Sequence, residues 1–547
     1  MKLSPLHTLL LAAISASWVG NTVAADPLAQ VIESLTSASE YRQAVWGILV
    51  ADLKTGESLY QQNAEKLFAP ASVTKLYSGA AALLALGPDY RFETPLYRRG
   101  GLRSDGTLTG DLILRASGDP SFGGRDTGDG RLAFANHDHT YANSGLIETD
   151  LHRGNPLRAM DHLAKLVRRA GIRRVLGDIL IDDRLYLPFR ATGSGPELVS
   201  PIMVNDNLVD LIVEPGPRPG TPARYRLWPQ TEYFQLDFDV TTSEAISSTV
   251  LTLQSQGEHR ISVRGQIPWR SRSLLRILPV DDPRQFARTL LIESLRRHGV
   301  RVEAGLFRSS HGQLPQAEDY ADLPCLGSYR SPPFSEFLKV TLKVSHNLYA
   351  SAFPALIASQ EGERTVEDGL RKQRAYLEEL GVDAKSISFG GGAGGAISDY
   401  VTARETVRLL RGLAQRPEWP AFREALPRIG VDGTLVELLP IASPAYGKIF
   451  AKTGTLVSPD LLNNRWLLRS KALAGVMTTA TGREIVFAIF VNNVLLPIDQ
   501  GTDREGKLLA AIAEQLYRHC PPTTLPGKTV PSTSAVPATF PGGSQRP

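Results

Sequence analysis

Ser72 and Lys75 are the first residues of this chain whose types and spacing could support chemistry. They stand one helical turn apart in the stretch ASVTK, which places both side chains on one face of a helix. A serine at a helix N-terminus lies beside free backbone N–H groups and the positive end of the helix dipole. A desolvated lysine has a lowered pKa and can act as a base. The pair fits a nucleophile with its base, and it also fits a helix-capping serine followed by a solvated lysine.

A second candidate is Ser345-His346-Asn347, which falls where the stretch from Leu342 to Ala358 begins to follow a helical pattern. A hydroxyl and a side-chain amide two residues apart, on a loop beside a helix, can face a cleft together. The alternative is an ordinary helix cap.

The sequence Lys-Thr-Gly occurs twice. Lys54-Thr55-Gly56 occupies the tight turn of a predicted hairpin, where Thr-Gly is ordinary turn chemistry. Lys452-Thr453-Gly454 lies on a predicted strand, followed by Thr455. A strand in a cleft wall can offer Lys452 and Thr453 to a carboxylate, and Gly454 allows a ligand to approach the backbone. We therefore expect the second copy to be functional and the first to be a turn.

Two elements must position Ser72. A hairpin is predicted from Val45 to Tyr60 by alternating apolar residues around the Lys54 turn. A helix is predicted from Ser72 to Leu86, after Pro70 and before Gly87-Pro88. Because this helix is apolar on nearly every face, we expect it in the centre of a domain.

The secondary structure predicted for the rest of the chain changes twice. Residues 98–325 read as short β-like segments cut by Gly and Pro, interrupted by one helix near Pro156–Ala170. Helical patterns then return, followed by a strand and a last helix; these stretches are 333–358, 365–380, 403–414, 483–492 and 503–517. This order predicts a domain built from both ends of the chain around a β-rich insertion.

Length and charge bound the class of protein. A chain of 547 residues favours two or three domains. The net charge of +4 is mild for this length and argues against nucleic-acid binding, while it allows a loose association with a membrane or the cell wall.

The two chain ends carry their own signals. Lys2, an apolar run beginning at Leu9, and Val23-Ala24-Ala25 predict a cleaved signal peptide over residues 1–25. No later segment is apolar enough to span a membrane, so we expect an exported product. The tail 521–547 is rich in Pro, Ser and Thr and is expected to be disordered.

Neither the cysteines nor the histidines define a clear site. Cys325 and Cys520 could pair in an oxidising compartment or remain thiols, and the sequence leaves both open. His137 and His139 would share one face of a strand and could bind a metal, but no third ligand is apparent. We therefore predict no metal and no cofactor.

Taken together, the order Ser-x-x-Lys, Ser-x-Asn, Lys-Thr-Gly resembles the signature of the penicillin-recognising serine enzymes. Roughly 270 residues separate Lys75 from Ser345, and a typical serine β-lactamase has no room for such an insert. The chain is similar instead to the class C low-molecular-mass penicillin-binding proteins, a family of D-alanyl-D-alanine carboxypeptidases and endopeptidases. Further matching boxes are SGDPSF (117–122), GDILIDDRLY (177–186), GVDGTL (430–435) and LAGVMTTATGREIVFAIFVNN (473–493).

The resemblance implies an α/β, multi-domain fold with a penicillin-binding transpeptidase-like domain, an antiparallel sheet flanked by helices. Its two parts are expected at residues 26–97 and 326–520, around the inserted β-rich domain or domains at 98–325. One departure is Gly392–Gly395, which lacks the Asp and Ser of the family's Asp-Gly-Ser-Gly box. Another is a loop at Val457–Lys471, which looks longer than usual and could reshape the cleft.

The resemblance also implies catalytic roles. Ser72 would attack the carbonyl of a D-Ala-D-Ala peptide and form an acyl-enzyme, and Lys75 would take its proton. Ser345 with Lys452 would return a proton to the leaving amine.

Substrate-binding roles are implied for Asn347, Thr453, Gly454 and Thr455. Asn347 would hold the substrate amide, and Thr453 with Lys452 the terminal carboxylate. The backbone N–H groups of Ser72 and Thr455 would form the oxyanion hole.

The expected function is a periplasmic serine-type D-Ala-D-Ala carboxypeptidase or DD-endopeptidase. Its expected partners are peptidoglycan stem peptides and cross-links, with β-lactams as inhibitors and no nucleic acid. Two alternatives stay open: a β-lactamase or esterase on the same scaffold, and a catalytically silent cell-wall binding protein. The motifs do not set the balance of carboxypeptidase to endopeptidase activity, the role of the insertion, or the oligomeric state.

Overall fold

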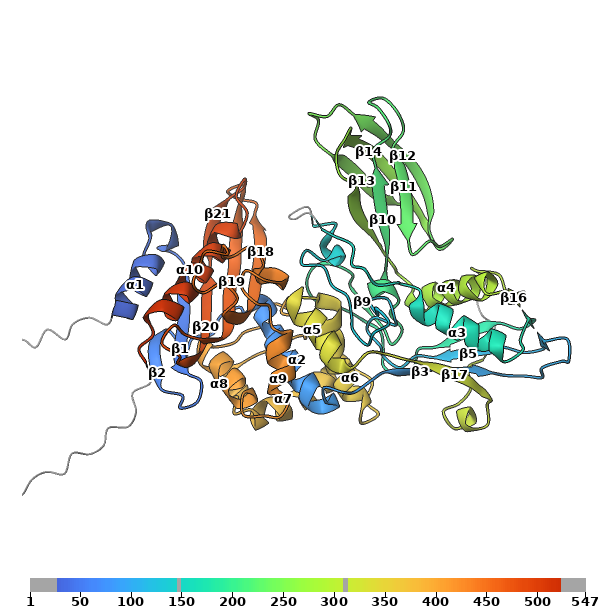
Figure 1. Cartoon of the computed structure of the whole chain (residues 1–547), viewed down its shortest axis with the longest axis horizontal. Helices are drawn as coiled ribbons and strands as arrows, with labels where there is room; N and C mark the ends of the chain where they lie inside the picture. The colour runs from blue at the N-terminus through green and yellow to red at the C-terminus, as the bar shows by residue number, and fades with distance from the viewer. Residues whose placement is uncertain (1–26, 145–148, 308–312, 523–547) are drawn as a thin grey trace, which may run out of the picture.

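The computed structural model describes residues 27–144, 149–307 and 313–522 (Figure 1). The predicted signal peptide at 1–25 lies outside the described residues, as does the tail from 523 onward. Among the described helices, none is long and apolar enough to cross a membrane.

A six-stranded antiparallel sheet is assembled from both ends of the chain. Its order is β18-β19-β20-β1-β2, and β21 pairs with the far end of β19. The N-terminal β1 pairs with the C-terminal β20 over eight residues, from Val45 opposite Asn492 to Asp52 opposite Ile485. The strands are β1 (Val45–Asp52), β2 (Ser58–Gln62), β18 (Ile449–Asp460), β19 (Arg465–Thr478), β20 (Glu484–Asn492) and β21 (Val494–Pro497).

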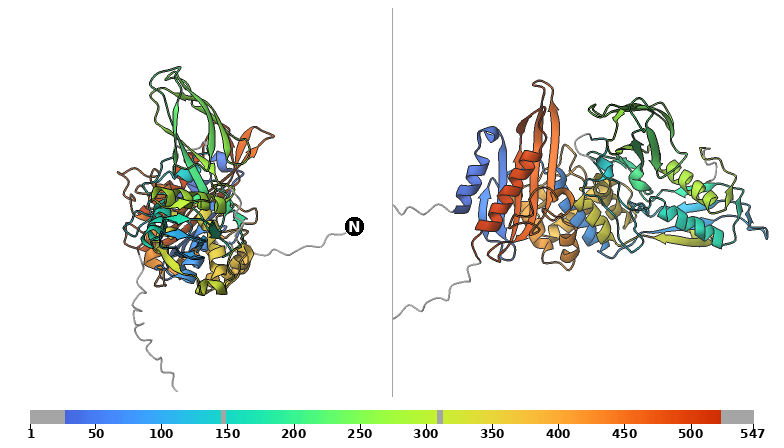
Figure 2. Two further views of the ribbon diagram at one scale, coloured as in Figure 1. Left: turned by 90° about the vertical axis from the view of Figure 1, so that its right-hand side faces the viewer. Right: turned by 45° about the horizontal axis from the view of Figure 1, so that its top comes forward.

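Helices cover both faces of this sheet (Figures 1 and 2). Successive side chains of a strand point to opposite faces, so Leu49 and Ala51 join one core and Ile48 and Val50 the other. The first core contains α2, α5, α6, α7, α8 and α9, and the second contains α1 and α10. Their bounds are α1 (Pro27–Thr36), α2 (Thr74–Leu86), α5 (Phe334–Lys343), α6 (Asn347–Ser359), α7 (Val366–Glu379), α8 (Ala403–Leu413), α9 (Trp419–Ala425) and α10 (Asp503–His519).

The chain between these two parts forms a separate set of small sheets. Strand β3 leaves the helical core and pairs with β17, which returns to it, in the order β17-β3-β5-β7. Three further sheets have the orders β16-β6-β4, β11-β10-β15 and β12-β14-β13, and β8 pairs with β9. With two helices, the four larger of these sheets enclose their own apolar core, whereas the β8–β9 pair packs against the first core of the sheet domain. Figure 1 shows the inserted part beside the sheet domain.

The bounds within this inserted part are β3 (Glu93–Arg98), β4 (Thr107–Leu108), β5 (Leu112–Arg115), α3 (Arg158–Arg169), β6 (Arg174–Val175), β7 (Ile179–Asp182), β8 (Phe189–Arg190), β9 (Leu198–Val199), β10 (Leu208–Glu214), β11 (Arg224–Trp228), β12 (Gln235–Ser243), β13 (Val250–Ser255), β14 (Arg260–Pro268), β15 (Leu274–Pro279), α4 (Pro283–Arg297), β16 (Arg301–Val302) and β17 (Cys325–Arg330). The predicted fold class is confirmed: an antiparallel sheet flanked by helices is interrupted by a β-rich insertion. The domain bounds at 98 and 325 stay a prediction; they fall at the end of β3 and the start of β17.

Two sequence-based expectations need correction. The stretch 333–358 is not one helix, because Ser345 has a left-handed φ of 63° and separates α5 from α6. The insertion contains a second helix, α4, that we did not predict. Arg288 and Glu293 are buried among its apolar residues, which obscures the periodicity that would have revealed it.

The two cysteines lie in different parts of the fold. Cys325 is exposed at the start of β17, whereas Cys520 is buried at the end of α10 in the second core. The structure does not join them in a disulfide.

Candidate active site

Ser72 and Lys75 meet at the start of the buried helix α2. Residues Ala71–Val73 form a turn of 3₁₀ helix that leads into α2, and Ser72 is half-buried while Lys75 is 0% exposed. The Lys75 Nζ atom donates to Ser72 Oγ at 2.8 Å, to Asn347 Oδ1 at 2.7 Å and to the Ala393 carbonyl at 2.7 Å. These three acceptors aim the amine at the serine hydroxyl.

The central sheet holds the segment that precedes Ser72. The Ala69 N–H donates to Asn492 Oδ1 at 2.8 Å, and Ser470 Oγ donates to the Ala69 carbonyl at 2.6 Å. Gly454 packs so closely that a methyl group on it would lie 2.5 Å from the Pro70 carbonyl. Gly454 is therefore required by packing against the serine segment, and not only by the approach of a ligand to β18.

Ser345 and Asn347 lie at the break between α5 and α6. Ser345 Oγ accepts from Lys452 Nζ at 2.9 Å. Asn347 bonds to Lys75 through its oxygen, and its Nδ2 donates to the Ser194 carbonyl at 2.8 Å. One short segment thus contacts both lysines and the insertion.

Strand β18 supplies the opposite wall. Lys452 is 0% exposed, and its Nζ also donates to the Thr453 carbonyl at 2.9 Å. Thr453 Oγ1 donates to Thr434 Oγ1 at 2.8 Å, and Thr455 is exposed to the cleft. In contrast, Lys54 lies in the β1–β2 turn with its side chain 82% exposed, as predicted for the first Lys-Thr-Gly.

Both buried lysines have altered proton affinity. Burial, reinforced by the nearby charge of Lys452, holds the pKa of Lys75 well below its ordinary value, and Asp399 opposes this shift. Burial lowers the pKa of Lys452 to about 7. A lysine with a lowered pKa is unprotonated in a larger fraction of molecules and can accept a proton.

These groups line a cleft of about 600 Å³ between the sheet domain and the insertion. Ser72, Ser345, Asn347, Thr453 and Thr455 face it, while Lys75 and Lys452 lie behind them. The insertion supplies part of its lining, at 136–138, Tyr141, Ser144 and Gly193-Ser194.

Several residues at this site were not predicted from the sequence. Ala393 belongs to the Gly-rich stretch that lacks the family's Asp and Ser, and it acts through a backbone carbonyl, which leaves no side-chain signal. Tyr141 donates from its hydroxyl to the Ser345 carbonyl at 2.5 Å, and Ser194 accepts from Asn347. The position of Gly392–Gly395 in the family pattern was the only available signal.

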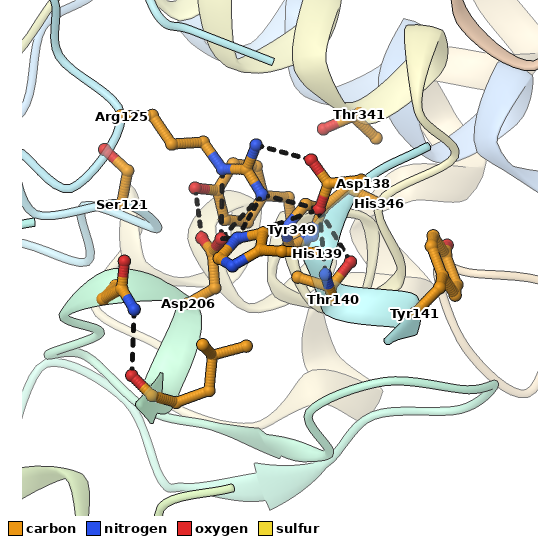
Figure 3. A network of polar contacts seen from close by, with 12 residues as sticks. Ser121, Arg125, Asp138, His139, Thr140, Tyr141, Asp206, Thr341, His346 and Tyr349 are labelled. Atoms are coloured by element: carbon orange, nitrogen blue, oxygen red, sulfur yellow. Dashed lines mark hydrogen bonds and ion pairs between the residues drawn. The ribbon is translucent and has the colours of Figure 1, made fainter. Parts of the chain in front are cut away.

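The two histidines considered as metal ligands do not point to a common site. The His137 side chain is 33% exposed in the cleft, with Nε2 3.8 Å from Glu437 Oε1, whereas His139 is fully buried. Within the described chain, His139, His152 and Asp206 place one ligand atom each within 4.8 Å of one another. His139 Nε2 already lies 3.1 Å from Arg125 Nη2 and 3.0 Å from Asp206, so we interpret this cluster as an ion network (Figure 3).

The chain is similar in sequence to known D-Ala-D-Ala carboxypeptidases. The model of the D-Ala-D-Ala carboxypeptidase 3 (S13) family matches residues 28–515. A D-alanyl-D-alanine carboxypeptidase of Actinomadura sp. is 27% identical over 457 residues, covering 80% of this chain and 78% of the relative. The D-alanyl-D-alanine carboxypeptidase DacB of Haemophilus influenzae is 23% identical over 464 residues, covering 82% of this chain and 85% of the relative.

Solved structures show the same architecture. The crystal structure of penicillin binding protein 4 from Haemophilus influenzae has a TM-score of 0.67 to this chain at 19% identity, and the match covers 89% of this chain and 99% of that one. The order of the three motifs and the match over nearly the whole described chain lead to one conclusion: the chain belongs to the D-Ala-D-Ala carboxypeptidase 3 (S13) family.

Proposed function

We propose that Ser72 is the nucleophile of this serine-type D-Ala-D-Ala carboxypeptidase, with Lys75 as its base. The observation that carries the proposal is the 2.8 Å contact between Lys75 Nζ and Ser72 Oγ, made by an amine whose pKa burial has lowered. A serine needs an adjacent base because its hydroxyl is a weak nucleophile at neutral pH.

The first step is acylation. Ser72 Oγ attacks the carbonyl carbon between the two D-Ala residues, and its proton passes to Lys75 Nζ. The backbone N–H groups of Ser72 and Thr455 would stabilise the oxyanion that develops, and both residues line the cleft.

The second step expels the leaving amine. Ser345 Oγ delivers its proton to the amine nitrogen as the C–N bond breaks, and Lys452 Nζ, which donates to it at 2.9 Å, replaces that proton. Terminal D-Ala leaves, and water then hydrolyses the Ser72 ester and restores the hydroxyl. A β-lactam would form the same ester but leave it to hydrolyse slowly.

Substrate recognition falls to the two cleft walls. Asn347 would bond the acyl-donor amide, while Lys452 and Thr453 would hold the terminal carboxylate. The proposed natural substrates are peptidoglycan stem peptides and cross-links in the periplasm, reached after removal of residues 1–25. Cleavage of a cross-link is the endopeptidase reaction of the same site, with a longer amine leaving.

The test is release of D-alanine from an N-acylated peptide that ends in D-Ala-D-Ala. The parent protein should release one D-Ala per peptide, and Ser72→Ala should release none. Turnover of a chromogenic cephalosporin faster than of the peptide would point to a β-lactamase instead. Inactivity of the parent on both substrates would leave only a silent binding protein.

A further inference from the structure

Ser345 has a backbone conformation that needs support. Its φ of 63° lies in the left-handed region, which is unfavourable for a residue other than glycine. Its hydroxyl must nevertheless stay within 2.9 Å of Lys452. Such a conformation persists only where surrounding contacts fix it.

The next residue, His346, provides one of these contacts. Its ring stacks on Tyr349 with centroids 3.9 Å apart and an interplanar angle of 25°. His346 Nδ1 accepts from the Tyr349 N–H at 3.4 Å, so the neutral ring carries its proton on Nε2. That Nε2 faces Asp206 Oδ2 at 3.5 Å.

Tyr349 and His346 therefore lead to the same carboxylate of the insertion. The Tyr349 hydroxyl donates to Asp206 Oδ1 at 2.6 Å, and Asp206 is 1% exposed. Asp206 itself has a φ of 57°, between Asn205 and Asn207, which are also left-handed. Left-handed backbones therefore lie on both sides of this contact, at Ser345 next to His346 and at the residues around Asp206.

Arg125 holds the Asp206 carboxylate in place through hydrogen bonds (Figure 3). Its guanidinium donates to Asp206 Oδ2 from Nε at 3.0 Å and from Nη2 at 2.7 Å, and to Asp138 at 2.8 and 2.9 Å. His139 bonds Asp206 at 3.0 Å and Asp210 at 2.7 Å. Burial lowers the pKa of His139, but the charges of Asp210 and Asp138 and the bonds to Asp206 and Asp210 outweigh it and raise the pKa to about 10. Two cations thus face three carboxylates in a buried cluster.

The same cluster reaches the Ser345 backbone by a second route. Asp138 is the N-cap of the turn His139–Tyr141, whose last residue donates its hydroxyl to the Ser345 carbonyl at 2.5 Å. The insertion therefore contacts the segment Ser345–Tyr349 at two places, the Ser345 carbonyl and the side chains of His346 and Tyr349.

We propose that Asp206, held by Arg125, is a positioning residue of the insertion that fixes Ser345 and Asn347 for catalysis. The insertion is then part of the catalytic apparatus through its buried interior, in addition to lining the cleft. This inference rests on the proposed function of Ser72, Ser345 and Lys452. Asp206 touches no reacting atom; it acts through Tyr349 and His346.

A purely structural role for the cluster predicts a different result. If the buried ion cluster only attached the insertion to the sheet domain, a substitution in the cluster would lower the stability of the protein without a specific effect on the reaction. Positioning predicts a loss of rate in a folded protein, because a displacement of about 1 Å costs roughly 100-fold in rate. Thermal stability and the separation of kcat from KM distinguish the two.

The test compares two buried tyrosines with the same chemistry. Tyr349→Phe removes the hydroxyl that bonds Asp206 and keeps the stacked ring. Tyr320→Phe is the control, because its hydroxyl also donates to a buried carboxylate at 2.6 Å, that of Asp182, away from the cleft. Asp206→Asn is the stronger variant, and Tyr349→Phe decides the matter if Asp206→Asn does not fold.

The measurements are the acylation rate with a fluorescent penicillin, kcat and KM for a D-Ala-D-Ala peptide, and Tm. We expect Tyr349→Phe to lower the acylation rate and kcat about tenfold, with a smaller change in KM, and Tyr320→Phe to change either by less than twofold. Equal rates in the two variants, with a parent that is acylated, would overturn the positioning role and leave the proposed function standing. A parent that is never acylated would overturn both.

Discussion

Replacing Lys452 by methionine should make the protein more stable and nearly inactive. Lys452 is fully buried, and its pKa of about 7 lies below the ordinary value of 10.5. A difference of roughly 3.5 pKa units corresponds to about 5 kcal/mol, which is the cost of burying this charge. This cost exceeds the net contribution of most single hydrogen bonds.

The net effect follows from what methionine removes and what it keeps. It removes the hydrogen bonds from Lys452 to Ser345 Oγ and to the Thr453 carbonyl, worth about 1 kcal/mol each. It keeps a side chain of similar length at the same buried position. We therefore expect the free energy of unfolding at neutral pH to rise by roughly 1–3 kcal/mol, in contrast to the usual effect of a core substitution.

The gain should depend on pH with a definite sign. Below about pH 7, Lys452 is charged in both the folded and the unfolded state, so the folded state bears the full burial cost. Between pH 7 and about 10.5 the folded state releases the proton while the unfolded state keeps it, and the cost fades. The stabilising effect of Lys452→Met should therefore be largest at and below neutral pH.

The assay combines Tm by calorimetry with acylation by a fluorescent penicillin. Lys452→Met should acylate at least about 100-fold more slowly, because Ser345 loses its partner for proton transfer. Lys54→Met is the matched control, since it alters the other Lys-Thr-Gly at an exposed turn. An acylation rate in Lys452→Met within severalfold of the parent, or an equal loss in Lys54→Met, would refute the reasoning.

Three further predictions concern the same cleft. The kcat/KM for a peptide with a free terminal carboxylate should fall as pH rises through about 7, as Lys452 loses its charge, and this limb should be absent from the pH profile of Lys452→Met. Lys75→Met should leave Ser72 without a base and abolish acylation measured by penicillin labelling, while circular dichroism shows a folded protein. Gly454→Ala should slow acylation about 10- to 100-fold by pushing on the Pro70 carbonyl, whereas Gly101→Ala, which meets only Thr109 at 3.5 Å, should match the parent.

The sequence predicted those parts of the site that depend on side-chain type. Ser72, Lys75, Ser345, Asn347, Lys452 and Thr453 come together as the order of their motifs implied, and the choice between the two Lys-Thr-Gly copies agrees with their burial. Each of these residues supplies a functional group, and the reaction restricts which groups can serve. Their individual roles stay predictions until the variants are measured.

Contacts made by the backbone and by the insertion could not be predicted from the sequence. The Ala393 carbonyl could belong to any residue, so no residue type marks it. Asp206 pairs with Tyr349 across about 140 residues, and nothing in either local sequence indicates the partner. The left-handed φ of Ser345 had no signal in the sequence either, although Ser345-His346-Asn347 was expected on a loop beside a helix.

The fold shows the same division. The alternating apolar residues of β1 and the continuous apolar run of β20 predicted strands, and the two do pair. Helix α4 escaped notice because buried Arg288 and Glu293 interrupt its apolar pattern. A prediction based on hydrophobic periodicity treats charged residues as exposed, so it misses helices that bury charges bonded within the protein.

The most direct test of the central claim is the intact mass of the protein after incubation with a penicillin. The parent should gain the mass of one penicillin, and peptide mapping should locate it on the fragment that contains Ser72. Ser72→Ala should gain nothing under the same conditions. An unmodified parent, or an adduct that persists in Ser72→Ala, would contradict the assignment of Ser72 as the nucleophile.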